Sequence, residues 1–166
     1  MPDLLTHAAI GALVRSEAPR QGLLWFVVGS MLPDVASRLP ALGLVTACGW
    51  FDFSVPLPLL EGLSVCHTPL PYLVLCWLLA LCLPRAVRAV AWINLSLAGV
   101  LHLALDATQR HLGDGYRLLF PLVNTKWELG WIDAEASLRY LPLTGAVVLL
   151  ALGIRWWRRR RRGGLA

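Results

Sequence analysis

The stretch Leu101-His102-Leu103-Ala104-Leu105-Asp106 closes an apolar run that begins near Ala86. On a helix, His102 and Asp106 lie on one face, one turn apart. A neutral imidazole and a carboxylate at this spacing can bind one divalent metal ion together. Both groups are costly inside lipid, so ionisable residues in such a run indicate a functional site. The alternative is a polar pair at a helix end that is hydrogen-bonded to neighbours or faces water.

Composition predicts a membrane protein. Of the 166 residues, 57% are hydrophobic and only 15% are charged, whereas a soluble domain carries about 25% charged residues. The mean hydropathy of the chain is +0.63. No polar linker divides the chain, and Met1-Pro2-Asp3 lacks the basic segment that opens a cleavable signal peptide. We therefore expect one membrane-embedded domain over residues 1–157 and a basic cytoplasmic tail over residues 158–166.

The predicted fold is all-α, an integral membrane bundle of about five hydrophobic helices with two irregular outer loops. The apolar runs cover residues 4–14, 22–32, 69–83, 86–107 and 140–157. Pro33 is expected to end the second helix, because proline has no N–H to donate inside a helix. Proline and glycine over residues 35–66, and a polar turn within residues 108–138, predict the two loops. The first two runs are shorter than the about 20 residues that cross a bilayer, so we expect them to be tilted, shielded or partly inserted.

Arginines set the expected orientation, because short loops rich in arginine tend to be cytoplasmic. Three such groups alternate along the chain: Arg15 with Arg20, Arg85 with Arg88, and the run Arg158 to Arg162. They predict an outer N-terminus and a cytoplasmic C-terminus. Five polar residues then fall at the outer ends of their helices: His7, Asp34, His67, His102 and Asp106. The arginine run indicates contact with anionic lipid rather than nucleic acid, since the rest of the chain has no basic stripe.

Three imidazoles and two carboxylates at one depth predict a metal centre with nitrogen and oxygen ligands. Zinc is the first choice, and manganese and iron are the alternatives. A tetrahedral catalytic zinc needs three protein ligands and a water, so five candidates also allow one to three ions, with Asp34 or Asp106 as a bridge. Each candidate has an ordinary alternative as a helix cap or as a hydrogen-bonded polar residue.

The motifs resemble those of a known family. The matching pieces are Thr6-His7, Leu32-Pro33-Asp34, His67-Thr68, His102-x-x-x-Asp106 and Gly115-Tyr-Arg-Leu-Leu-Phe-Pro121. In this order they resemble the YdjM-like bacterial inner-membrane proteins, which are regarded as metal-dependent hydrolases distantly similar to zinc phospholipase C. The resemblance implies that His7, Asp34, His67, His102 and Asp106 bind the metal. The family's His-Arg pair is missing here, where the chain reads Glu61-Gly-Leu-Ser-Val-Cys66.

The expected function is metal-dependent hydrolysis of a lipid or lipid-linked phosphoester at the outer, periplasmic face of the inner membrane. Proton transfer would fall to His111, Glu128 or Glu135 in the second outer loop. The basic side chains on the same, outer side of the membrane could hold a phosphate: Arg110, Arg117, Lys126 and Arg139. The alternative for all of these residues is ordinary charge in an aqueous loop. No nucleic-acid partner is expected.

Two other classes of function stay open at this stage. A non-enzymatic membrane protein can bind metal or haem, although haem gives no role to Asp34 and Asp106. A structural or partner-binding protein needs no site at all. Cys48 and Cys66 lie in the first outer loop, where they can form a disulfide. The segment Trp127 to Glu135 is assigned no role.

Overall fold

The described chain is mostly helical, as the sequence predicts. The computed structural model describes residues 4–15, 20–110 and 115–133, and parts of 142–160. Its helices are α1 (Leu4–Val14), α2 (Arg20–Gly49), α3 (Leu57–Ser64), α4 (Pro69–Leu81) and α5 (Arg85–Ala107), with a 3-10 turn η1 (Val65–His67) between α3 and α4. Two short parallel strands follow, β1 (Gln109–Arg110) and β2 (Ile132–Asp133).

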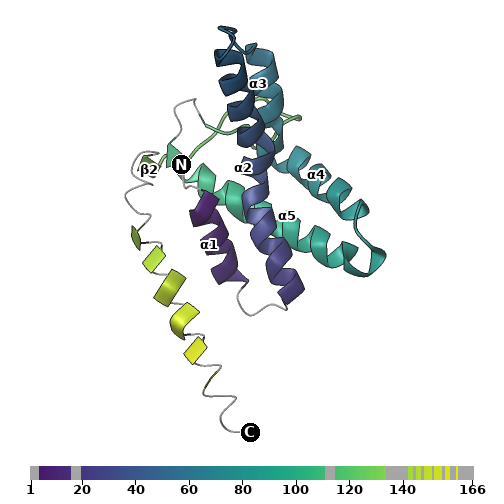
Figure 1. The fold of residues 1–166 in the computed structure, drawn as a ribbon, viewed down its shortest axis with the longest axis vertical. Coiled ribbons are helices and arrows are strands. Elements are labelled where there is room, and N and C mark those ends of the chain that lie inside the picture. The colour runs from purple at the N-terminus through teal and green to yellow at the C-terminus, as the bar shows by residue number, and fades with distance from the viewer. Residues whose placement is uncertain are drawn as a thin grey trace.

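Helix α2 is the central element of the fold. Figure 1 shows α1 beside one half of α2 and α3 beside the other half, while α5 crosses α2 near its middle. Helix α4 lies along α5 and is joined to α3 through the η1 turn. Residues from α1, α2, η1 and α5 therefore approach one another around the middle of α2.

Helix α2 continues through Pro33 and Pro40, so the prediction that Pro33 ends this helix is wrong. A proline leaves the carbonyl four residues earlier without its helical N–H partner. For Pro33 that carbonyl belongs to Gly29, and the buried Tyr72 hydroxyl donates to it at 2.9 Å. The same hydroxyl lies 3.0 Å from the Leu95 carbonyl oxygen of α5. A donor from a distant helix thus replaces the missing backbone donor, which a local sequence pattern cannot reveal.

The first predicted loop is therefore shorter than the expected span of residues 35–66. Helix α2 extends to Gly49, α3 covers Leu57–Ser64, and residues 50–56 connect the two helices. Proline occupies the first turn of both α3 and α4. There its missing N–H costs nothing and its fixed backbone angle favours the helix. Cys48 and Cys66, the pair considered for a disulfide, are free thiols.

The helices pack closely where glycine faces a large side chain. A Cβ added at Gly99 would lie 1.8 Å from the Tyr72 ring, and one added at Gly29 would lie 2.7 Å from the Leu95 Cα atom. Tyr72, Cys76 and Leu95 form the buried apolar cluster at this crossing. The contact fixes the spacing of α2, α4 and α5 next to the polar residues.

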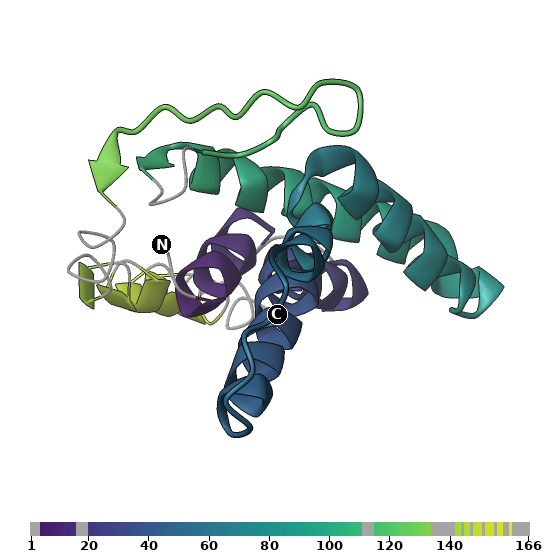
Figure 2. The ribbon, with the colours of Figure 1, turned by 90° about the horizontal axis from the view of Figure 1, so that it is seen from above.

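The segment after α5 returns to the end of that helix. The Leu129 and Trp131 backbone N–H groups donate to the carbonyls of Ala107 and Thr108, both at 2.8 Å. Tyr116 pairs with Trp127 through an antiparallel bridge. Figure 2 shows this segment running alongside α5. The pairing gives the Trp127 region a structural role that the sequence left unassigned, and it places Tyr116 near the end of α5.

Of the expected spans, α5 is long and apolar enough to cross a membrane. Residues Leu57–His67 and Pro69–Leu81 pass the same test together as a span broken by a 72° bend. Apolar side chains such as Trp77 and Leu97 are about half exposed, at 52% and 51%. The described residues within the predicted last span, 140–157, are helical. The described residues therefore provide one or two spans of the expected five.

Loss of the Tyr72 hydroxyl should destabilise the fold. In Tyr72→Phe the buried Gly29 carbonyl loses its donor, which typically costs about 1–3 kcal/mol. In a Pro33→Ala background residue 33 regains an N–H for that carbonyl, so the same substitution should cost less. Free energies of unfolding in detergent for the four members of this double-mutant cycle measure the difference. Equal costs in both backgrounds would contradict the role given to Tyr72.

Candidate metal centre

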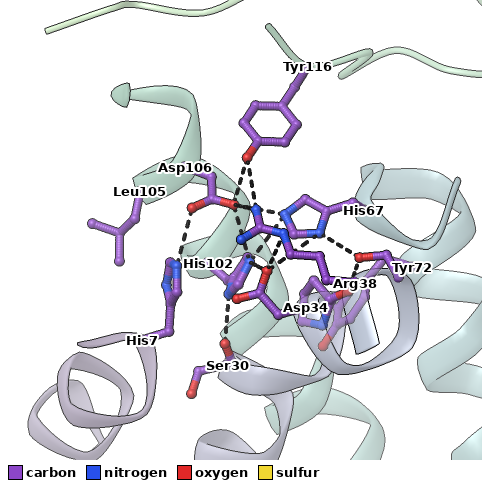
Figure 3. Close-up of polar contacts among 12 residues, drawn as sticks. His7, Ser30, Asp34, Arg38, His67, Tyr72, His102, Leu105, Asp106 and Tyr116 are labelled. Carbon is purple, nitrogen blue, oxygen red and sulfur yellow. Dashed lines mark hydrogen bonds and ion pairs between the residues drawn. The ribbon is translucent and has the colours of Figure 1, made fainter. Parts of the chain in front are cut away.

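The five residues singled out from the sequence lie together (Figure 3). His7 comes from the second turn of α1, Asp34 from the interior of α2, and His67 from the η1 turn. His102 and Asp106 come from the last turns of α5, one helical turn apart. All five are buried. Asp34 is not at a helix end, contrary to expectation, because α2 continues past Pro33.

Four of these residues present donor atoms at the spacing of a single ion. One ligand atom each from Asp34, His67, His102 and Asp106 lies within 4.8 Å of all the others. The His67 Nε2 atom is 2.8 Å from Asp106 Oδ2 and 3.3 Å from His102 Nε2. His102 Nε2 is 3.4 Å from Asp106 Oδ2. Zinc bonds of about 2.1 Å in a tetrahedron place ligand atoms roughly 3.4 Å apart. The distances here run from 2.8 to 3.9 Å, so the donor set could hold one ion after small shifts of its side chains.

The two imidazoles of this set direct unprotonated nitrogens at one another. His102 Nδ1 lies 2.7 Å from the Ser30 carbonyl oxygen, which can only accept, so Nδ1 carries the proton. The Ser37 hydroxyl donates its single proton to the Pro33 carbonyl at 2.6 Å, so it accepts from His67 Nδ1 at 3.1 Å. In this tautomer both Nε2 atoms face the cluster with lone pairs, and without a metal ion an added proton on His67 Nε2 would bond Asp106 Oδ2 at 2.8 Å instead. Such outer hydrogen bonds are the usual way in which proteins orient histidine ligands.

Asp34 adds a buried oxygen that lacks a hydrogen-bond donor. Its Oδ1 atom has no hydrogen bond among the described residues and lies 3.9 Å from His102 Nε2. Arg38 Nε is 2.9 Å from this oxygen but forms an ion pair rather than an aligned hydrogen bond. The guanidinium charge offsets part of the cost of burying this carboxylate, and an oxygen without an aligned donor keeps lone pairs for a further cation. The oxygen is therefore suited to bind a metal ion.

His7 contacts the four-donor set but is not one of its members. Its Nε2 atom is 3.2 Å from Asp106 Oδ1 and donates to it, because a carboxylate can only accept. Its ring stacks on His102 with centroids 3.7 Å apart. In this arrangement His7 orients Asp106, and its role as a direct ligand stays a prediction.

Tyr116 and Arg38 also belong to the cluster, and residue patterns alone did not identify them. The Tyr116 hydroxyl donates to Asp106 Oδ2 at 2.9 Å, and its ring stacks on His67. Burial and the nearby charge of Asp106 raise the pKa of Tyr116, so its hydroxyl stays a donor. Tyr116 lies in the family-like motif of residues 115–121. Arg38 is one turn beyond Asp34 on α2, a spacing that becomes visible only if the helix continues past Pro33.

The residues expected to move protons are only partly described. His111 and Glu135 lie outside the described residues, as does Arg139. Glu128 is half-buried on the segment that follows Tyr116. Arg110 lies 3.5 Å from Asp133 and Arg117 lies 3.5 Å from Glu61, in surface ion pairs. Lys126 is exposed. The catalytic and phosphate-binding roles of all these residues stay predictions.

Removal of the Ser37 hydroxyl should weaken metal binding. Ser37→Ala takes away the acceptor that fixes the His67 ring, and such partners contribute about 10–100-fold in metal affinity. Ser64→Ala is a matched control, because this exposed hydroxyl donates to the Glu61 carbonyl away from the cluster. Competition with a chromophoric chelator measures zinc affinity for both variants. Equal affinities would show that Ser37 does not support a ligand.

Comparison with known proteins assigns the chain to a family. The model of the YdjM inner membrane protein family matches residues 1–165. No curated protein and no solved structure gives a significant match. The distant similarity of the family to zinc phospholipase C therefore stays an expectation that the resemblance implies. A match over nearly the whole sequence means that the chain belongs to the YdjM family of inner membrane proteins.

Proposed function

We propose that this protein is a membrane-bound metal-dependent hydrolase that acts on a lipid or lipid-linked phosphoester. The observation that carries the proposal is the inward-facing donor set, in which Asp34, His67, His102 and Asp106 direct acceptor atoms at one point. Lone pairs about 3 Å apart repel one another unless a metal ion or a proton lies between them. Zinc suits two imidazoles and two carboxylates best, and manganese and iron are the alternatives.

Each residue around the ion would have its own task. Ser30 and Ser37 hold the imidazoles in the tautomer that binds metal. His7 and Tyr116 hold the two oxygens of Asp106. A bound divalent ion supplies Lewis acidity and lowers the pKa of water towards about 7. Proton transfer is assigned to the loop residues His111, Glu128 and Glu135, which need only reach the site through one water.

A lipid substrate is favoured by the position of the site. The apolar helix α5 is the strongest candidate for a membrane span, and His102 and Asp106 lie at its end. A site at the end of a span lies at the level of lipid headgroups, where phosphoesters are found. We propose that the apolar helices, including the partly described run 140–157, form about five spans with the site on the periplasmic side.

One observation favours a second candidate, a purely structural metal site. The side chains of His102 and Asp106 are 0% exposed, and those of His67 and Asp34 are 5% and 7% exposed. Structural zinc sites are closed in this way, whereas catalytic ones keep an open position. Such a protein would bind metal and hydrolyse nothing. Metal content and hydrolysis must therefore be measured on the same variants.

Asp106→Asn should reduce metal content and abolish hydrolysis. The amide keeps the shape of the carboxylate but removes the charge that lies 2.8 Å from His67 Nε2. The matched control is Asp52→Asn, because Asp52 lies in the exposed connection between α2 and α3. Elemental analysis of the purified proteins gives the metal content, and a panel of lipid phosphoesters gives the activity. Unchanged metal content in Asp106→Asn would refute the assigned site, and metal loss without any wild-type hydrolysis would favour the structural candidate.

The proposed topology predicts which residues face the periplasm. In a cysteine-free background, Leu119→Cys should react with a membrane-impermeant maleimide in intact cells, because Leu119 is exposed on the segment beside the site. Arg160→Cys should react only after lysis, because the C-terminal arginine run is expected to be cytoplasmic. The reverse labelling pattern would place the site on the cytoplasmic side.

A further inference from the structure

Arg38 occupies the accessible edge of an otherwise buried cluster. Its side chain is 31% exposed, whereas the side chains of Asp34 and Asp106 are 7% and 0% exposed. Figure 3 shows its guanidinium between Asp34 and the Tyr116 hydroxyl. A molecule that approaches the cluster from this edge would meet a fixed positive charge.

Two of the three guanidinium nitrogens of Arg38, Nε and Nη2, contact the cluster. Nε lies 2.9 Å from Asp34 Oδ1, and Nη2 lies 3.5 Å from both Asp106 Oδ2 and the Tyr116 hydroxyl oxygen. Nη1 has no contact of this kind within the described residues. A planar guanidinium has five N–H donors in a rigid fork that matches a phosphate or carboxylate. Arg38 therefore has donors left for an oxyanion next to the ion.

Charge balance indicates the class of oxyanion. Two carboxylates, one guanidinium and one divalent ion would leave a single positive charge, because imidazoles that bind a metal do so in the neutral form. A buried site with a net charge is costly, and a ligand of opposite charge removes that cost. A phosphate diester carries one negative charge, whereas a monoester carries about −1.5 to −2 at neutral pH. Before the bound water loses a proton, the diester fits the cluster with no charge left over, whereas a dianionic monoester leaves a surplus negative charge.

We propose that Arg38 binds a phosphoryl oxygen of the substrate beside the metal ion and selects phosphate diesters. This inference rests on the proposed hydrolase function and names its substrate class. It differs from the sequence-based expectation, which gave phosphate binding to the loop cations of residues 110–139. In the structure, Arg110 and Arg117 form surface ion pairs, and Arg38 is the arginine in contact with the donor set among the described residues.

The rival explanation is that Arg38 only orients Asp34. An orienting residue would act on metal affinity, since Asp34 is one of the four donors. A substrate-binding residue would act on oxyanion affinity in protein that already holds its metal. The two roles are therefore separated by measuring zinc and phosphate ester binding independently.

The test uses the full-length protein in detergent, loaded with zinc. The ligands are two phosphate esters that each carry a phenyl group. Methyl phenyl phosphate is a monoanion, and phenyl phosphate is mainly a dianion at pH 8. The variants are Arg38→Gln, which removes the charge, and Arg38→Lys, which keeps the charge and loses the fork. Arg85→Gln is the matched control, because Arg85 is exposed at the other end of α5, about 30 Å along the helix from Asp106. Titration calorimetry gives ester affinity, and chelator competition gives zinc affinity.

We expect wild-type protein to bind the diester more tightly than the monoester. Arg38→Gln should lose about 10–100-fold in diester affinity, as removal of charge-assisted hydrogen bonds implies, with zinc affinity within about threefold of wild type. Arg38→Lys should lose less, and Arg85→Gln should be unchanged. These results would hold even for a protein that hydrolyses nothing, so failure of the hydrolase proposal is seen separately in the activity assay.

Three outcomes would overturn the inference. The first is a fall in zinc affinity with unchanged ester affinity in the zinc-loaded variant, which makes Arg38 an orienting residue. The second is an equal loss in Arg85→Gln, which makes the effect one of overall charge. The third is tighter wild-type binding of the monoester, or no binding of either ester, which removes the diester assignment.

Discussion

The orientation of the candidate metal ligands depends on two hydrogen bonds that point away from the cluster. His102 donates its Nδ1 proton to the Ser30 carbonyl, and His67 donates its own to the Ser37 hydroxyl. Because each proton is used on the outer side, the two Nε2 atoms carry lone pairs and face each other at 3.3 Å. Asp106 Oδ2 adds a third acceptor at the same point. A metal ion or an added proton at this point makes the arrangement favourable.

These bonds depend in turn on the course of α2. Ser30, Asp34, Ser37 and Arg38 share one face of this helix because their spacing follows the helical period. The face exists only because α2 continues past Pro33, where the Tyr72 hydroxyl serves the Gly29 carbonyl. Tyr72 also contacts Leu95 of α5, the helix that carries His102 and Asp106. The same packing that holds the helices together therefore sets the positions of the donors.

Sequence reasoning predicted which side chains would cluster better than it predicted the fold. His102 and Asp106 follow from helical spacing in an apolar run, and the arginine pattern placed His7, Asp34 and His67 near them. The second helix was predicted too short. The hydrogen bond that replaces the one lost at Pro33 comes from Tyr72, which is distant in sequence. For the same reason the sequence analysis did not place Arg38 in the site, because Arg38 is one turn beyond Asp34 only if the helix continues. Tyr116 was found within a motif, but its contact with Asp106 depends on the return of residues 115–133 to α5, a tertiary feature without a local signal.

X-ray absorption at the zinc edge of the zinc-loaded, full-length protein tests the central claim most directly. The account predicts one ion per chain with nitrogen and oxygen ligands at about 2.0–2.2 Å and the outer-shell scattering of two imidazoles. Scattering from sulfur at about 2.3 Å would indicate that cysteines bind the ion instead. That result, or a protein that retains no zinc, would contradict the account.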